Sequence, residues 1–186
     1  RSRRLVVASR PAHARMGEPL RELVVPVLEM AKQVTTVSQH CGPGTGRPDW
    51  NVVELWVNMQ RNGSINAAHF HPGSFWAGVF YVDVGEVYST KETGGELLMY
   101  DPRGCLPRML APYLQYSMPE LHDAGTSISS APVSVQCVRF PGWLFHAVNT
   151  YHGTAPRISV AFNLDPVLAP GMMNGAHKHS VREYRR

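Results

Sequence analysis

The chain has 186 residues, 44% of them hydrophobic, which is enough for one substantial core but short for two independent ones. Charged residues make up 17%, below the roughly 25% of an average soluble domain, and 16 glycines with 15 prolines indicate many turns. This composition argues against a helical bundle and favours one β-rich domain that spans residues 1–186.

The net charge of +4 is confined to the two ends of the chain. Residues 1–15 hold five arginines and no acidic residue, and residues 177–186 carry a net +3, which leaves −4 for the residues between them. A nucleic-acid-binding domain would carry a basic stripe with interleaved aromatic residues through its body, and this chain has none. We therefore expect basic, solvated tails and no nucleic-acid partner.

Cysteine usage and hydropathy indicate a soluble, cytoplasmic protein. Cys41, Cys105 and Cys137 are odd in number and lack C-x-x-C spacing, so a disulfide framework is not expected. No apolar run reaches the roughly 18 residues that a membrane span needs, and the Arg-rich start is not followed by a signal-peptide core. We expect no association with a membrane.

The first predicted element is a helical segment at about residues 17–40. Its apolar residues recur at helical spacing, namely Leu20, Val24, Leu28 and Ala31. Pro26 predicts a break or kink inside this segment. We expect the helix to pack on the outside of a sheet, followed by a turn-rich linker over residues 41–50.

Strand patterns dominate after this linker. The segments rich in Val and aromatic residues are 51–58, 76–84, 97–100, 133–140 and 158–164. Residues 106–130 form a longer polar insert with no convincing strand, and such inserts often carry substrate contacts. Short strands without helices between them predict an antiparallel sandwich or barrel.

The strongest local motif is His69-Phe70-His71. Residues i and i+2 of an extended chain point to the same side of a sheet, so the two imidazoles can bind one ion. Neutral imidazole suits iron, copper, zinc or nickel. A single H-x-H fits a surface pair equally well, so a further ligand is required.

His146 is the candidate third metal ligand. It follows a predicted strand and the Pro141-Gly142 turn, where a side chain can point into the mouth of a barrel. Because it follows Leu144 and Phe145, it also fits a histidine that is simply buried in the core.

Arg157 and Ser159 share one face of the last predicted strand, and Ile158 and Val160 lie on the other. Burying a guanidinium without an anion costs several kcal/mol. Its planar fork is well suited to a carboxylate. The pair therefore indicates a site for an organic acid, with a surface arginine at the start of a strand as the alternative.

The order H-x-H, GGEL, turn plus His, and R-x-S resembles the 2-oxoglutarate/Fe(II) oxygenase superfamily. The segments NGSINAAHFHPGSFWAGVFYV, GGELLMYDPR and FPGWLFHAVNTYHGTAPRISVAFN are similar to a bacterial group with the pattern H-x-H-P, GVYYV, DPR, FPSWLxH and RISIAFN. The resemblance covers roughly residues 51–165.

The resemblance implies a mainly β fold with flanking helices, a double-stranded β-helix of the jelly-roll, cupin-like kind. It also implies Fe(II), with 2-oxoglutarate and O₂ as co-substrates, and oxidation of an unactivated C–H bond, usually to a hydroxyl. The substrate would be a small molecule or a peptide. Members of the superfamily often pair, which favours a homodimer with the N-terminal helix as a contact.

The resemblance also implies roles for single residues. The three histidines would hold the iron. Arg157 would pair with the distal carboxylate of 2-oxoglutarate while Ser159 donates a hydrogen bond to it. Asn58, Asn66 and Tyr81 would add polar contacts in the pocket, and each fits ordinary strand or turn chemistry equally well.

One position departs from the superfamily. Its usual metal site has two histidines and one carboxylate, and the carboxylate position here matches His71. Three arrangements follow: a site of His69, His71 and His146, a two-ligand site with water in the gap, or a carboxylate from Asp101 or Glu96. We favour the three-histidine site, because Asp101 in the turn DPRG fits a residue that caps its own turn.

A cupin-type three-histidine metalloenzyme is the closest alternative, since Gly63 precedes His69 by the spacing of the cupin motif. Cupins normally place a Glu four or five residues after H-x-H, where this chain has Ser74, Phe75 and Trp76. The R-x-S pair separates the two readings, because only the oxo-acid enzyme requires it. A third hypothesis is a non-catalytic module that binds a small molecule or a peptide.

Overall fold

The structure is a computed structural model that describes residues 18–36, 47–85, 93–104 and 127–167. These residues form one helix, α1 (Glu18–Gln33), and eight strands. The strands are β1 (Asp49–Gln60), β2 (Ser64–His69), β3 (Trp76–Asp83), β4 (Leu97–Tyr100), β5 (Ser127–Ser130), β6 (Cys137–Pro141), β7 (His146–Tyr151) and β8 (Arg157–Val167).

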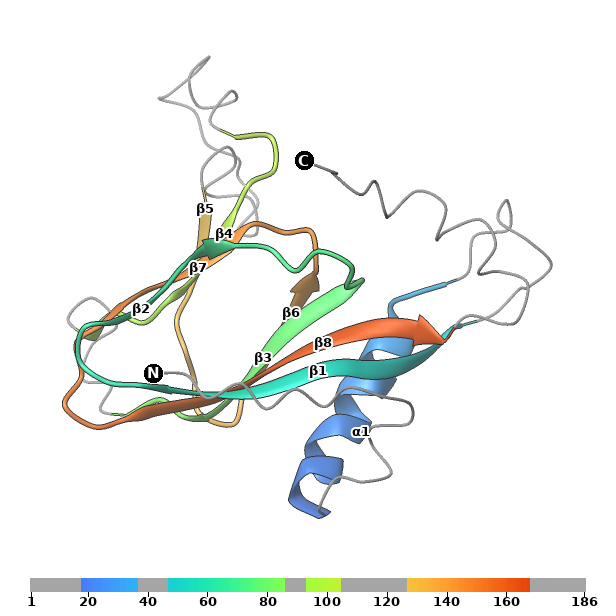
Figure 1. The fold of residues 1–186 in the computed structure, drawn as a ribbon, viewed down its shortest axis with the longest axis horizontal. Coiled ribbons are helices and arrows are strands. Elements are labelled where there is room, and N and C mark those ends of the chain that lie inside the picture. The colour runs from blue at the N-terminus through green and yellow to red at the C-terminus, as the bar shows by residue number, and fades with distance from the viewer. Residues whose placement is uncertain (1–17, 37–46, 86–92, 105–126, 168–186) are drawn as a thin grey trace, which may run out of the picture.

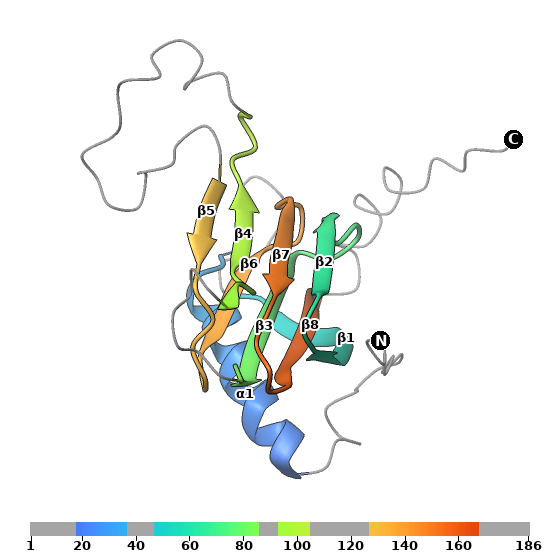
Figure 2. The same cartoon turned by 90° about the vertical axis from the view of Figure 1, so that its left-hand side faces the viewer.

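The strands form two four-stranded sheets, in the orders β1-β8-β3-β6 and β2-β7-β4-β5. Every pairing between neighbouring strands is antiparallel. The two sheets face each other, and α1 lies against the outer side of the first sheet (Figures 1 and 2). This arrangement confirms the predicted jelly-roll, double-stranded β-helix fold.

Helix α1 continues through Pro26, so the predicted break is wrong. A proline removes one backbone hydrogen bond and crowds the carbonyl of residue i−4. Both Pro26 and Glu22 lie on the exposed side of the helix, where water can serve the freed carbonyl. The opposite face buries Val24, Val27 and Ala31, so tertiary packing keeps the helix intact.

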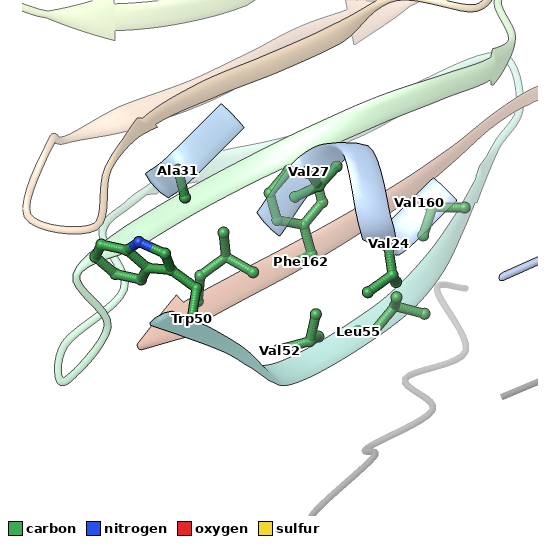
Figure 3. Packing of buried hydrophobic residues seen from close by; sticks show 9 residues of the cluster. Val24, Val27, Ala31, Trp50, Val52, Leu55, Val160 and Phe162 are labelled. Atoms are coloured by element: carbon green, nitrogen blue, oxygen red, sulfur yellow. The ribbon is translucent and has the colours of Figure 1, made fainter. Parts of the chain in front are cut away.

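The core under α1 joins the helix to the first sheet (Figure 3). Val24 and Val27 of the helix cluster with Leu55 of β1 and with Val160 and Phe162 of β8. Each such side chain contributes about 1.5–3 kcal/mol when it leaves water. This core fixes the even-numbered residues of β8 on the outer face, and the odd-numbered residues therefore face the other sheet.

A register shift in β1, as at a β-bulge, decides which of its residues face inward. The register with β8 shifts between Val52 and Glu54. Val52 and Leu55 both belong to the core under α1, although three positions separate them. A regular strand would place them on opposite faces. The extra residue therefore turns Asn58 and Gln60 toward the space between the sheets.

Three strands were absent from the sequence prediction. β2 and β5, with the sequences SINAAH and SISS, each contain a single isoleucine and no Phe, Tyr, Trp or Val, so they hold few of the residues typical of strands. They form because their partner strands offer hydrogen bonds, and the strand preferences of single residues do not include this pairing. β5 lies at the end of the predicted insert 106–130, so the last four residues of that insert were wrongly predicted to lack a strand. Residues 105–126 lie outside the described part of the chain. His146 begins β7.

Another predicted strand starts later than expected. Val135 has a positive φ of 64°, which places a turn where the sequence suggested strand from residue 133. The strand β6 therefore begins at Cys137, whose thiol is free. The other two cysteines and the basic tails lie outside the described residues. No helix in the described segments is long and apolar enough to cross a membrane.

Candidate metal centre and cavity

Three histidines meet between the two sheets. His69 ends β2, His146 begins β7, and the two residues are partners in the register of these strands. His71 follows in the turn after β2, and its Nε2 lies 3.3 Å from Nε2 of His146. One ligand atom from each imidazole lies within 4.8 Å of the others. Of the residues that the structure describes, only these three form such a group.

Backbone carbonyls set the tautomers of two of these rings. Nδ1 of His69 lies 2.7 Å from the carbonyl oxygen of Ala67, and Nδ1 of His146 lies 2.8 Å from that of Leu144. A carbonyl only accepts, so each Nδ1 carries the hydrogen and each Nε2 keeps its lone pair. Such outer hydrogen bonds orient the imidazoles of metal sites.

The surroundings favour the neutral form of the histidine on β7. Burial lowers the pKa of His146, and the neighbouring His69 acts in the same direction, whereas the hydrogen bond to Leu144 opposes both. The ring of Phe140 packs against His146 at 4.5 Å between centroids. A neutral imidazole is the form that binds a metal, so no proton has to be displaced at neutral pH.

The histidines line a cavity of about 80 Å³ between the sheets. Both sheets contribute to its wall, and no Asp or Glu occurs among the described residues that line it. The lining residues are Trp56, Asn58, Asn66, His69, His71, Gly78, Val79, Tyr81, Leu97, Phe140, His146, Val148, Arg157, Ser159 and Ala161. The structure thus brings every sequence-predicted site residue to one cavity.

Arg157 is a buried cation with no carboxylate partner at this cavity among the described residues. It is 2% exposed, and its Nη1 donates a hydrogen bond to Oε1 of Gln60. Its guanidinium lies 5.0 Å from the centre of the Tyr81 ring. By hydrogen-bond geometry, Nε of Arg157 and the hydroxyl of Tyr81 have no partner in the described part of the chain, although the hydroxyl is close enough to the guanidinium to stabilise its charge. Two orphaned polar groups beside one cavity indicate a ligand that accepts hydrogen bonds.

Burial opposes the charge of this arginine. Desolvation is the main cause that lowers the pKa of Arg157, and the neighbouring Tyr81 acts in the opposite direction. Burial likewise raises the pKa of Tyr81, so its hydroxyl stays protonated and can donate. A buried guanidinium is stable only when an acceptor or anion offsets the loss of hydration.

Ser159 and Asn58 lie one step further along the same inner face. They are direct partners in the register of β1 and β8, and Ser159 is also the partner of Tyr81 on β3. Both side chains are buried and line the cavity. The hydroxyl and the amide thus join the same polar wall as Arg157.

The two carboxylates considered as alternative ligands are engaged elsewhere. Asp101 accepts hydrogen bonds from the backbone and side chain of Arg103, at 2.8 Å and 2.6 Å, and so caps its own turn. Glu96 accepts a hydrogen bond from Asn149 at 3.2 Å. Neither belongs to the histidine group. The described residues therefore offer a donor set of three imidazoles.

Gln60 is the site residue that sequence reasoning missed. The predicted strand ended at Asn58, two residues short of the observed end of β1. Continuing the alternation of inward-facing and outward-facing residues by two residues beyond Asn58 would have placed Gln60 on the same face as Asn58. The sequence held no sign that its partner would be Arg157, because the pairing depends on the register of β1 with β8.

Residues 54–163 match the sequence profile of a family described as "Putative 2OG-Fe(II) oxygenase". No curated protein matches the chain. A prolyl hydroxylase from Trichoplax adhaerens, solved with a hypoxia-inducible-factor peptide, is 12% identical, with a TM-score of 0.52 over 87% of this chain and 62% of that one. A collagen prolyl hydroxylase of Paramecium bursaria Chlorella virus-1, solved with 2-oxoglutarate, is 12% identical, with a TM-score of 0.52 over 90% and 80%.

A prolyl-4-hydroxylase from Pseudomonas putida is 17% identical, with a TM-score of 0.43. The match covers 77% of this chain but only 61% of the bacterial protein. At such identities the likeness to the two prolyl hydroxylases with the higher TM-scores shows the shared fold alone.

Proposed function

The chain belongs to the 2OG-Fe(II) oxygenase family, and from that premise we propose that it is a non-haem dioxygenase. It uses Fe(II), 2-oxoglutarate and O₂ to hydroxylate or otherwise oxidise a small-molecule or peptide substrate. One observation carries the proposal: a buried arginine with no carboxylate partner in the described part of the chain lines the same cavity as three converging imidazoles.

The histidine group fits a divalent transition metal. Two of its rings have their Nδ1 atoms engaged by carbonyls, so their Nε2 atoms are free to coordinate. His69, His71 and His146 would hold Fe(II), which when bound supplies the O₂ chemistry and polarises the 2-oxo acid. Three neutral donors leave the full charge of the ion in place, whereas the usual carboxylate would cancel part of it.

The polar wall fits a 2-oxo acid with a second carboxylate. The free edge of Arg157 would pair with the distal carboxylate, and the hydroxyls of Ser159 and Tyr81 would donate hydrogen bonds to it. The amide of Asn58 would add a further polar contact. These contacts would satisfy the two groups that are otherwise buried without partners.

Apart from Asn66, the rest of the cavity wall is largely apolar. Val79, Leu97, Val148 and Ala161 line it from both sheets. A dry cavity strengthens the interaction between Arg157 and an anion, and it protects reactive species from side reactions. The chain's own contribution to catalysis is thus binding, orientation and the exclusion of water.

Anaerobic titration tests the proposal. The protein is reconstituted with Fe(II), and addition of 2-oxoglutarate is expected to produce a weak visible charge-transfer band. Exposure to O₂ with a substrate library should then release succinate. Iron binding without 2-oxoglutarate binding would instead support the cupin-type enzyme, and failure to bind either would support the non-catalytic binding module.

We further propose that residues 1–186 form one domain of a cytoplasmic homodimer. The free thiol of Cys137 is compatible with a reducing compartment. Light scattering at micromolar concentration tests the dimer, which a monomeric mass would contradict. Fractionation of the source cells tests the compartment.

A further inference from the structure

Gln60 holds one edge of the Arg157 guanidinium. It is 4% exposed at the end of β1, directly opposite Arg157 in the register with β8. Its Oε1 accepts a hydrogen bond from Nη1 of Arg157, and its Nε2 lies 3.5 Å from Oδ1 of Asn66. A guanidinium only donates, so the amide oxygen must face Arg157 and the amide nitrogen must face Asn66. The chemistry of the partners therefore fixes the orientation of the amide.

The partner of Arg157 at this position is neutral. A glutamate would have nearly the same size and shape as Gln60, and it would cancel the charge of Arg157 by forming a buried ion pair. No described residue that lines the cavity is acidic. Among the described carboxylates, only Glu96 has an electrostatic effect on the pKa of Arg157, and this effect is weaker than those of burial, Tyr81 and Tyr151. Arg157 thus keeps its charge for something that enters the cavity.

We propose that Gln60 is a positioning residue for the distal carboxylate of the 2-oxo acid. It holds one side of the Arg157 guanidinium without neutralising it, which leaves the unpartnered Nε edge for the ligand. This inference rests on the proposed function, because it assumes that the ligand of Arg157 is the distal carboxylate. The neutrality of residue 60, rather than its size, is the property that matters.

The test is Gln60→Glu, measured by binding rather than by turnover. Calorimetry under anaerobic conditions, with Mn(II) in place of Fe(II), gives the Kd of 2-oxoglutarate. We expect this Kd to rise at least tenfold, which is about 1.4 kcal/mol. The Kd of 2-oxobutyrate, a 2-oxo acid without a distal carboxylate, should stay within about twofold. The unfolding midpoint of the ligand-free variant should equal or exceed that of the wild type, since a carboxylate would offset a buried cation and the part-buried Asn66 amide can turn to donate to it.

Two further variants separate charge from general disruption. Gln33→Glu adds the same charge at an exposed position at the end of α1, and it should leave both Kd values unchanged. Gln60→Ala releases the guanidinium without neutralising it, and it should weaken 2-oxoglutarate binding less than Gln60→Glu does.

Each of the other possible results would overturn either this inference or the proposed function. Wild-type 2-oxoglutarate affinity in Gln60→Glu would overturn the inference. Equal losses for 2-oxoglutarate and 2-oxobutyrate, or a lowered unfolding midpoint, would also overturn it, because the effect would then be structural. A wild-type protein that does not bind 2-oxoglutarate at all would instead overturn the proposed function.

Discussion

Replacing Arg157 by methionine should abolish high-affinity binding of 2-oxoglutarate while leaving the fold intact. Methionine keeps much of the length of the side chain and its packing against Tyr81, but removes the guanidinium. In the structure Arg157 is buried and lines the cavity, and its Nε has no hydrogen-bond partner among the described residues. The substitution therefore removes the one cation of the polar wall and alters little else.

The expected loss of binding free energy follows from the burial of the pair that Arg157 would form with the distal carboxylate of 2-oxoglutarate. Removing one partner of a buried, hydrogen-bonded charge pair costs about 2–5 kcal/mol. A loss of about 3 kcal/mol corresponds to an increase in Kd of roughly 150-fold. The ligand-free protein should lose little stability, because the cost of burying an unpaired guanidinium disappears while Gln60 loses its donor.

The assay is anaerobic calorimetry of 2-oxoglutarate binding to the Mn(II)-loaded protein. The chain offers a matched control in Arg139, which lies over the ring of Trp76 at 4.6 Å, as Arg157 lies beside Tyr81. Arg139 belongs to β6 and does not line the cavity. Arg139→Met should therefore leave the Kd within about twofold of the wild-type value.

Two results would refute this reasoning. A Kd for Arg157→Met within about threefold of the wild-type value would show that the distal carboxylate lies elsewhere. An equal loss of affinity in both arginine variants would show that net charge, rather than a specific contact, governs binding. Equal thermal unfolding of Arg157→Met and wild type would exclude unfolding as the cause.

Three further predictions concern the metal group and the packing behind it. His71→Ala should reduce bound Fe(II) after anaerobic dialysis at least tenfold, measured by elemental analysis, whereas His152→Ala, in an exposed loop, should leave it unchanged; equal retention would contradict the three-imidazole site. Burial lowers the pKa of His146 below its usual value of 6.5, so the unfolded chain binds more protons than the folded chain as the pH falls toward and below 6.5, and metal-free protein should lose stability as the pH falls below about 7. His146→Gln should flatten this dependence in thermal unfolding, and an unchanged slope would refute its origin. Gly78→Ala should cost about 1–3 kcal/mol in denaturant unfolding, because the new Cβ would lie 2.4 Å from Cζ of Phe162. Phe162→Leu should recover part of that loss, and purely additive losses would argue against this contact.

Local sequence pattern by itself determined much of this protein. Alternation placed Arg157 and Ser159 on the face of their strand opposite to Val160, and the structure shows the same division. Helical spacing identified the face of α1 that packs on the sheet. Both patterns could be read from the sequence because strand alternation and helical spacing depend only on residues that are close along the chain. The proline in α1 misled the prediction, since a local penalty was outweighed by packing on the opposite face.

The tertiary structure decided what depends on pairing between distant strands. β2 and β7 join His69 to His146 through their register, although neither strand was predicted from the sequence. The register shift near Val52 turned Gln60 toward Arg157, and no periodicity within β1 predicts where a strand gains an extra residue. Sequence pattern therefore supplied the chemical groups and the faces they occupy. Which groups meet was set by the hydrogen-bond register between strands, a non-local property that the partner strand determines.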